Sequence, residues 1–322
     1  MRKNVKELKL NFSGYTGGCP QYPFYLDSFR RYAGYPSVQT LVSLSLVGVS
    51  ISGYFLESVL FKFPNLEHLM MKYLKCGQGD LIVVGDLLKL RYLEISSCHD
   101  YSKLEMAARN LVSIVNGAYN QDVKFHYVPL LSEASFSGPS SLHWIHNLHH
   151  SGFLSQLTKL TLTILIQDFM QYSTGLPQFG NLKQFEVLIF DPDDKGLLAS
   201  THFIYACPVL HKFKQQRLFI EPTWRHPKGF LGGRSPKVAE KHHHSLKIFE
   251  MVGFGGAPAD IEFVLYQARC AVTLEKVLLD PHLPFDEGKP SKQNPLEQID
   301  ASRKQAKLLQ NQLPARVRME VL

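Results

Sequence analysis

The sequence predicts an α/β solenoid, in which strand–loop–helix units stack side by side. Three observations carry this prediction. A short apolar pattern recurs about ten times along the chain. Apolar residues within each copy alternate, as they do in a strand with one buried side. The segments between copies contain helical patterns followed by proline or a short turn, so the strands should be parallel, with irregular helices and loops on the other side.

The recurring pattern is L-x-x-L-x-L, with other apolar residues allowed at the same positions. Its copies begin at Val5, Leu41, Leu66, Leu90, Leu111, Leu131, Leu157, Leu182, Leu210, Leu246 and Leu274. Most steps span about 20 to 28 residues, the range of leucine-rich repeats. One such unit cannot bury its own apolar face, so neighbours must stack. We therefore expect a horseshoe-shaped leucine-rich-repeat solenoid with a parallel concave sheet over residues 1–282, built to present a surface.

Two of the connecting segments have clear helical patterns. Residues 54–61 are apolar on one face, which predicts a short helix. A second predicted helix follows Asp260, its N-cap candidate, and places Ile261, Val264 and Ala268 on one face. Proline or a short turn then leads into the next strand, because proline ends a helix and extends the chain before it.

Three segments interrupt or end the repeat. Residues 14–37 and 221–245 are too long and too rich in glycine and proline for a plain connection, so we expect loop insertions there. Residues 283–295 form a polar, proline-containing linker. Residues 296–322 have the pattern of an amphipathic helix followed by a strand, and such a terminal element can cap the exposed end of a stack.

Composition indicates a folded protein without identifying a partner. Lys and Arg number 35 against 28 Asp and Glu, which gives a net charge of +7. This excess is compatible with an acidic partner or with nucleic acid, and it specifies neither. The five cysteines are scattered and form no C-x-x-C pair, which indicates a reducing compartment. Cys98 follows an apolar copy by three residues, and we expect it to be a buried thiol.

Neither end of the chain nor its apolar stretches predict a membrane protein. The N-terminal residues carry charge and lack the apolar core of a secretory signal. The stretch 41–61 alternates serine with leucine or valine and then contains Gly53 and Glu57, so a strand and a short helix explain it better than a membrane span. We therefore expect a cytoplasmic or nuclear protein with no membrane partner.

Sequence signatures of catalysis are missing from the chain. There is no P-loop, no G-x-G-x-x-G after a strand, no H-E-x-x-H and no G-x-S-x-G. Gly253-Phe-Gly-Gly lacks the third spaced glycine and is interpreted as a tight turn. The fourteen histidines include two groups: His143, His146, His149 and His150, and the run His242, His243 and His244. The first group is not interpreted as a metal site because no matching carboxylates or cysteines lie nearby in the sequence. The second is interpreted as a solvated loop, because adjacent histidines cannot easily all face one ion. We expect no catalytic residue, no metal and no cofactor.

Two surfaces are candidates for partner binding. The first is the concave face of the sheet, formed by residues that alternate with the buried ones: His68, Met70, Lys72, Tyr92, Glu94, Lys159, Gln184, Glu186, Lys212 and Lys214. The second is the basic loop, with the cations Arg225, Lys228, Arg234, Lys237 and Lys241. Trp224 and Phe230 are interleaved with the Lys and Arg residues of the stretch 211–247, as base stacking requires. Three interpretations of the loop stay open: a solvated structural loop, an acidic protein partner, and nucleic acid as the least favoured.

Several segments, taken in order, resemble the repeat region of plant F-box/leucine-rich-repeat proteins of the FBD-associated type. They are residues 4–12 with the loop 19–26, the strand starts FPNLEHL and CPVLHKF, and residues 244–256, 260–266 and 274–281. The resemblance implies a repeat domain that recruits a target protein to a ubiquitin ligase, while an F-box domain binds a Skp-type adaptor of a cullin–RING complex.

The chain begins in its first repeat, without a recognisable F-box segment. The resemblance therefore implies the target-binding part of a substrate receptor, with an unknown target protein as its partner. A Skp-type adaptor and cullin would join only if a longer form supplies an F-box. The alternative is a stand-alone repeat scaffold or decoy that occupies a target without marking it for degradation.

Overall fold

The computed structural model describes residues 5–12, 22–23, 40–51, 55–73, 75–76, 80–85, 88–98, 101, 103–117, 122–138, 141–142, 145, 152–165, 176–190, 196–218, 242–284 and 296–322. The chain divides into two compact units, Met1–Leu157 and Thr158–Leu322. We call them the first and second units and describe each by itself.

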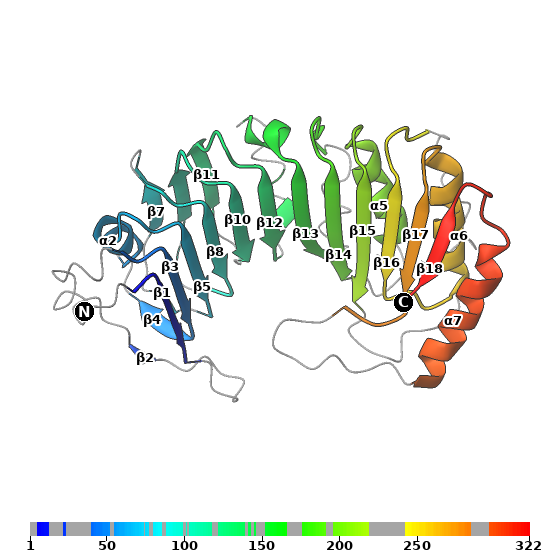
Figure 1. The fold of residues 1–322 in the computed structure, drawn as a ribbon, viewed down its shortest axis with the longest axis horizontal. Helices are drawn as coiled ribbons and strands as arrows, with labels where there is room; N and C mark the ends of the chain where they lie inside the picture. The colour runs from blue at the N-terminus through cyan, green and yellow to red at the C-terminus, as the bar shows by residue number, and fades with distance from the viewer. Residues whose placement is uncertain are drawn as a thin grey trace. The chain divides into compact units, whose positions relative to one another are not determined.

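The first unit is built on a parallel sheet whose strands follow one another in chain order (Figure 1). These strands are β1 (Glu7–Asn11), β3 (Ser43–Val47), β5 (His68–Lys72), β8 (Tyr92–Ser96), β10 (Ser113–Gly117) and β12 (Glu133–Ser137). Each pairs with the next in register, so Leu44, Leu69, Leu93 and Ile114 form one buried row across the sheet. The predicted parallel strands are confirmed here.

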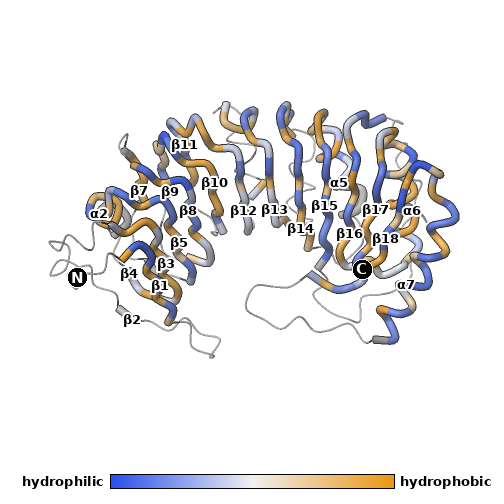
Figure 2. Tube along the Cα trace, viewed as in Figure 1, coloured by the Kyte–Doolittle hydropathy of each residue, from blue (hydrophilic) through white to orange (hydrophobic). Residues whose placement is uncertain are grey.

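Side chains alternate between the core and the exposed face along each of these strands. Figure 2 shows the matching alternation of apolar and polar residues along the tube. Short turns determine which residues of a strand are buried, because a backbone hydrogen bond closes the turn directly before the strand. Leu66 N–H donates to Phe63 O at 3.0 Å, and Leu131 N–H donates to Val128 O at 3.1 Å. The buried leucine after each turn therefore begins every repeat at the same point.

The opposite side of the first unit differs from the prediction of helices and loops there. Only α2 (Phe55–Lys62) and the short 3-10 helix η2 (Phe153–Gln156) are helical elements with described bounds in this unit. A second parallel sheet has the order β11 (Asp122–Tyr127), β9 (Lys103–Ala107) and β7 (Asp80–Val84). A third joins the short strands β2 (Tyr22–Pro23), β4 (Val49–Ile51) and β6 (Lys75–Cys76).

The second sheet forms because its segments have an apolar period of two. Leu81, Val83, Leu104 and Met106 are all buried, while the residues between them face outward. A helix would spread these residues around its circumference, whereas a strand places them on one side. The prediction of helices was therefore wrong for these connections, and the helix predicted at 54–61 is confirmed with a shift of one residue.

The second unit repeats the same plan, and its first three main strands are longer than those of the first unit. In chain order they are β13 (Lys159–Leu165), β14 (Gln184–Phe190), β15 (Lys212–Leu218), β16 (Ile248–Val252), β17 (Lys276–Asp280) and β18 (Arg318–Val321). Here the connections do carry helices, α5 (Gly196–Tyr205) and α6 (Pro258–Cys270), which lie against one side of the strands (Figure 1). Phe185, Phe213 and Phe249 from neighbouring strands form a row of rings with centroids 5.7 and 6.1 Å apart.

The C-terminal helix α7 (Leu296–Gln310) lies beside β18, at the end of the second unit's sheet (Figure 1). Ile299, Ala306 and Leu309 are its buried apolar residues. The helix also contacts the Gly253-Phe-Gly-Gly segment, since Ser302 Oγ donates to Gly255 O at 2.9 Å. The helix and strand thus occupy the place expected for a terminal cap. Residues 285–295, most of the predicted linker, lie outside the described residues.

Glycine is required at two positions of this segment. Gly253 and Gly256 have positive φ angles of 82° and 73°, a region that other residues rarely adopt. A Cβ atom on Gly253 would lie 2.9 Å from Arg217 O, and one on Gly256 would lie 2.9 Å from Gln305 Cβ. The predicted tight turn is confirmed, and it brings the backbone close to β15 and to α7.

Asp260 has a different role from the predicted N-cap. Helix α6 begins at Pro258, so Asp260 is its third residue. Its Oδ2 accepts the N–H of Gly255 at 2.9 Å and that of Ala257 at 3.3 Å, and its Oδ1 accepts Arg217 Nη1 at 2.6 Å. The predicted start of the helix was therefore wrong: the helix begins about one turn before Asp260, because the proline at its start was not taken into account.

Candidate protein-binding surface

The exposed residues of the main strands form a continuous surface within each unit, which we call the sheet face. In the first unit it includes His68, Met70 and Lys72 on β5 and Tyr92 and Glu94 on β8. The register sets His68 opposite Tyr92, Met70 opposite Glu94 and Lys72 opposite Ser96. The structure therefore brings all five predicted residues together on adjacent strands. Glu94 is only 5% exposed, whereas His68 is fully at the surface.

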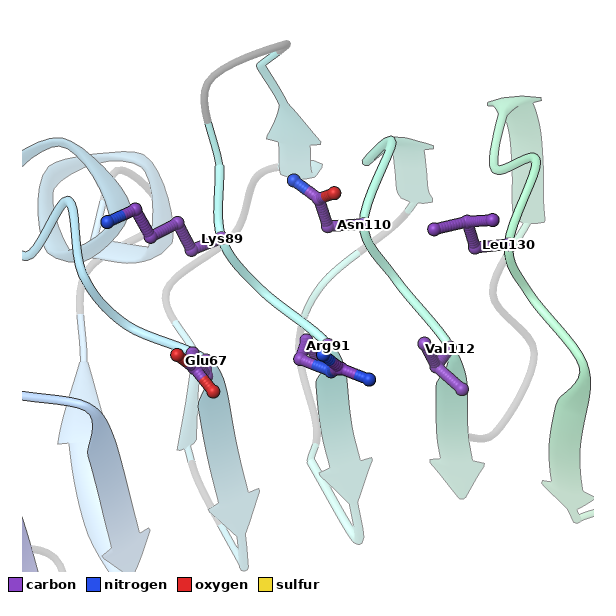
Figure 3. Close-up of a pocket in the computed structure, with 6 residues that line it drawn as sticks. All are labelled: Glu67, Lys89, Arg91, Asn110, Val112 and Leu130. Carbon is purple, nitrogen blue, oxygen red and sulfur yellow. The ribbon is translucent and has the colours of Figure 1, made fainter.

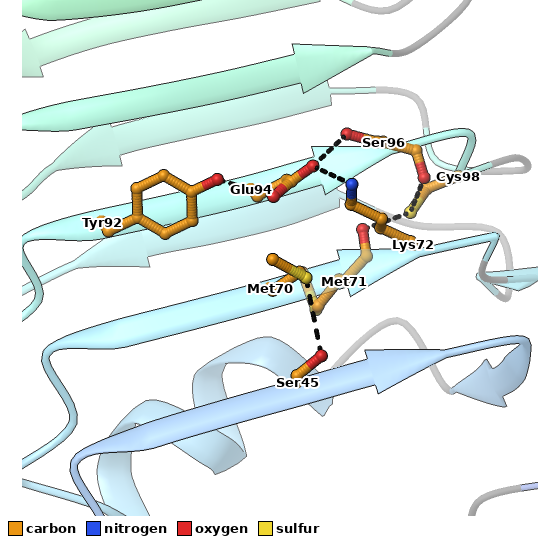
Figure 4. Close-up of polar contacts among 8 residues, drawn as sticks. All are labelled: Ser45, Met70, Met71, Lys72, Tyr92, Glu94, Ser96 and Cys98. Atoms are coloured by element: carbon orange, nitrogen blue, oxygen red, sulfur yellow. Dashed lines mark hydrogen bonds and ion pairs between the residues drawn. The ribbon is translucent and has the colours of Figure 1, made fainter. Parts of the chain in front are cut away.

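Glu94 is the centre of a polar network on this face (Figure 4). Its carboxylate accepts Tyr92 Oη at 2.6 Å and Ser96 Oγ at 3.1 Å, and it pairs with Lys72 Nζ at 2.8 Å. A carboxylate held by several donors in this way is ordered before any partner arrives. The network therefore fixes the position of the Tyr92 ring, which lies 6.2 Å from the His68 ring between centroids.

Small residues surround this cluster. Ser45 on β3 donates its hydroxyl to Met70 Sδ at 3.5 Å, and the face further along the sheet carries Ser113, Gly117 and Ser135. Behind the face, the Cys98 thiol lies 3.5 Å from Met71 O and is fully buried, which confirms the predicted buried thiol. Tyr92, His68 and Met70 thus have short side chains beside them on the face. Tyrosine and methionine are enriched among the residues that dominate protein interfaces.

A shallow pocket of about 260 Å³ lies where strands of the first unit begin (Figure 3). Its lining residues come from the turns and the strand starts: Glu67, Lys89, Arg91, Asn110, Val112 and Leu130. Lys89 donates to Asn65 Oδ1 at 2.7 Å, and Asn110 Nδ2 donates to Leu88 O at 2.7 Å. The volume is below the range of about 300 to 1,000 Å³ that is usual for small-molecule sites. It suits one side chain of a partner.

None of the residues that line this pocket was predicted from the sequence as a site residue. Asn110 and Leu130 each precede the first buried leucine of a copy, and Lys89 precedes Leu90 in the same way. This fixed position in the turn was the available signal, because repeated turns place equivalent residues side by side.

In the second unit the predicted face residues are Lys159, Gln184, Glu186, Lys212 and Lys214. The register sets Lys159, Gln184 and Lys212 in one row, and Glu186 and Lys214 in the next row. Lys214 Nζ lies 3.3 Å from Glu186 Oε1. These charges pair across neighbouring strands, so this face is more polar and more charged than that of the first unit.

Glu250 on β16 extends the pairing. Its carboxylate lies 2.8 Å from Lys212 Nζ and 3.6 Å from Lys214 Nζ. Gln216 also donates to Glu186. These pairs are partly exposed, and exposed pairs contribute little stability, typically about 0 to 1 kcal/mol. They do fix where positive and negative side chains lie on the surface.

The basic loop lies outside the described residues, and so do all five of its predicted cations, Arg225, Lys228, Arg234, Lys237 and Lys241. The histidine group His143, His146, His149 and His150 also lies outside them. Within the described ranges, no group of three or more His, Cys, Asp or Glu side chains is arranged to hold a metal ion. No helix in the same ranges has the length and apolarity needed to cross a membrane.

His243 is buried, so the prediction of a solvated loop was wrong for this residue. Its Nε2 lies 2.9 Å from Cys207 O, and its Nδ1 accepts the N–H of Leu246 at 3.0 Å. A neutral ring with the proton on Nε2 satisfies both contacts. Burial lowers the pKa of His243, against the opposing effect of the Cys207 carbonyl, and His244 lowers it further. The histidine anchors the start of a repeat, with His242 and His244 exposed beside it.

Because the pKa of His243 is lower in the folded protein than the ordinary value of about 6.5, protonation favours the unfolded chain. Stability from this group should be complete above about pH 6.5 and should fall as the pH drops toward the folded pKa. We expect urea unfolding from pH 7.5 to pH 5 to show this decline in the wild-type protein. His243→Gln should reduce the slope, and His244→Gln should retain it. Equal slopes in all three proteins would contradict the assignment.

The turn–strand units, in register and parallel within each unit, define a leucine-rich-repeat protein, a class built to offer an extended sheet face to other proteins. A model of the family described as At1g61320/AtMIF1, LRR domain, matches residues 24–312. This match spans most of the 322 residues, and the chain belongs to that family. The predicted α/β leucine-rich-repeat fold is thereby confirmed. No curated protein gives a significant match.

Proposed function

We propose that the chain is a non-enzymatic protein-interaction module that binds a target protein through its sheet faces. The observation that carries the proposal is the cluster of Tyr92, His68 and Met70, held in place by the Glu94 network on the first unit's face. Tyrosine and methionine are enriched at the centres of interfaces, and a fixed aromatic ring loses little conformational freedom on binding. The neighbouring pocket can receive a side chain from the same partner.

We further propose that this recognition serves a ubiquitin ligase in the cytoplasm or nucleus. The support is the ordered resemblance to plant F-box/leucine-rich-repeat proteins together with membership of a leucine-rich-repeat family. In that role the module presents a target, and an F-box domain binds the Skp-type adaptor and cullin. The second candidate is a stand-alone scaffold or decoy. Recovery of adaptor and cullin with the chain favours the ligase, and recovery of the target alone favours the decoy.

The test compares two tyrosines of the first unit. Tyr92 lies on the sheet face, and Tyr127 lies on β11 of the second sheet with 53% exposure. Wild type, Tyr92→Ala and Tyr127→Ala would each be used to capture proteins from plant extract, with quantitative mass spectrometry of the bound fraction. We expect Tyr92→Ala to weaken target binding about tenfold or more, as loss of a central interface tyrosine does. Tyr127→Ala should bind like wild type, and the reverse pattern would overturn the proposal.

A further inference from the structure

Every main strand of the second unit has a cation at its first residue or directly before it. We call this set the basic band: Lys159 on β13, Lys183 directly before β14, Lys212 on β15, Lys247 directly before β16, Lys276 on β17 and Arg318 on β18. In the first unit the same two positions carry a cation only at β1 and β8, as Lys6 and Arg91, and they also carry the carboxylates Glu7, Glu67 and Glu133. The band is therefore a feature of the second unit and not of the repeat itself.

The sheet register places the band along one end of the strands. Lys212, Lys276 and Arg318 belong to one row of paired positions, since Lys212 pairs with Ile248, Ile248 with Lys276, and Lys276 with Arg318. Lys183 and Lys247 lie one residue before this row, directly before β14 and β16. Neighbouring strands are about 4.8 Å apart, so the band extends over about 24 Å.

Part of this positive charge has no internal counterpart. Lys212, Lys247 and Lys276 each pair with a glutamate of a neighbouring strand or turn. Lys159 and Lys183 are exposed and form no ion pair with any described residue. Lys247 and Glu275 are themselves 52% and 66% exposed, so a competing anion can reach that pair. The band consequently offers cations in a line, and Lys159, Lys183 and Arg318 are the ones without an ion pair to a described residue.

The charge pattern favours an acidic protein segment over nucleic acid. Glu186, Glu250 and Glu320 stand two residues further along their strands than the band row, where they would repel a phosphate backbone lying across the sheet. In addition, no Phe, Tyr or Trp occurs among the described residues of the band and that next row, so stacking platforms for bases are missing there. An extended peptide is narrower than a nucleic-acid strand, and about seven of its residues cover the band's length of about 24 Å.

We propose that the basic band is the docking site for an extended, Asp- and Glu-rich segment of the target protein. Carboxylates of the segment form charge-assisted contacts with Lys159 and Lys183 and share the exposed cations further along. This inference rests on the proposed function, because it names the chemistry of the target. It adds that the second unit selects the partner by charge, and such complementarity raises the association rate and rejects basic competitors.

The test uses the full chain and fluorescence anisotropy with a labelled peptide of about ten residues that alternates Glu and Ser, long enough to span the band. Comparison probes are the same peptide with Gln for Glu and a single-stranded oligonucleotide of similar length. The band variant is Lys159→Glu/Lys183→Glu. The control is Lys304→Glu/Lys307→Glu, which makes the same charge change at two exposed positions of α7. Thermal melts establish that both variants fold.

We expect the acidic peptide to bind wild type, to bind the band variant about tenfold or more weakly, and to bind the control within about twofold. Equal losses in the two variants, equal binding of the Gln peptide, or no binding by wild type would overturn the inference. Tighter binding of the oligonucleotide, with the same loss in the band variant, would assign the band to nucleic acid instead. Each of these failures leaves the Tyr92 capture experiment unaffected, so the proposed function is judged separately.

Discussion

Replacing Asp260 with alanine is expected to destabilise the second unit by about 3–5 kcal/mol, the cost of breaking a buried ion pair. Arg217 and Asp260 have side chains that are only 3% and 2% exposed, and Nη1 lies 2.6 Å from Oδ1. The alanine would leave the guanidinium buried without its carboxylate. It would also remove the acceptor of the N–H groups of Gly255 and Ala257, which form the turn before α6. Urea unfolding monitored by circular dichroism measures the loss.

Two further variants separate the ion pair from other effects. The double variant Arg217→Met/Asp260→Leu removes both charges and should recover the part of the stability that the unpaired guanidinium costs, because apolar replacement of a buried pair is often neutral. Asp300→Ala removes an exposed carboxylate on α7, with 66% exposure, and should change stability by less than about 0.5 kcal/mol. An Asp260→Ala protein as stable as wild type would contradict the role assigned to the pair.

Replacing Leu93 with proline is expected to have an effect at least as large in the first unit. Leu93 is fully buried as the second residue of β8, with Leu69 and Ile114 as its register partners on β5 and β10. Proline removes a ladder hydrogen bond and cannot fit a central strand, which costs about 3 kcal/mol or more. The lost leucine side chain adds about 2 to 5 kcal/mol through the cavity it leaves.

A thermal melt of Leu93→Pro should therefore show loss of the cooperative transition of the first unit. Leu93→Met is the matched control, because it keeps the volume and the backbone N–H and should cost less than about 1.5 kcal/mol. If Leu93→Pro melted like Leu93→Met, the strand register assigned to β8 would be incorrect.

The main strands were predictable from the sequence because each repeat carries its own signal. Leu41 marks the end of the turn, Leu44 marks the first buried position of the strand, and Leu46 shows the alternation of buried and exposed residues. The same spacing of apolar residues returns in each copy. The second sheet of the first unit was missed for a physical reason. Segments such as Lys103–Ala107 are short, and only pairing with their neighbours makes an extended conformation stable.

The candidate site was predictable only in part. Alternation placed Tyr92, Met70 and Lys212 on the exposed faces, but it could not show that Lys72 pairs with the Glu94 carboxylate, since that contact depends on the register between two strands. His243 shows the same limit, because its partner Cys207 lies in an earlier repeat. Contacts between residues far apart in the sequence decide these roles, and no local pattern encodes them.

Site-specific photocrosslinking from the two sides of the first unit tests whether a partner protein binds the sheet face. Benzoylphenylalanine would replace Met70 on the sheet face in one protein and Tyr127 on β11 in another. The two proteins would be irradiated in the same plant extract, and crosslinked partners would be identified by mass spectrometry. We expect a specific protein partner to crosslink at position 70 and not at position 127. Crosslinking of that partner at position 127, with none at position 70, would contradict binding through the sheet face.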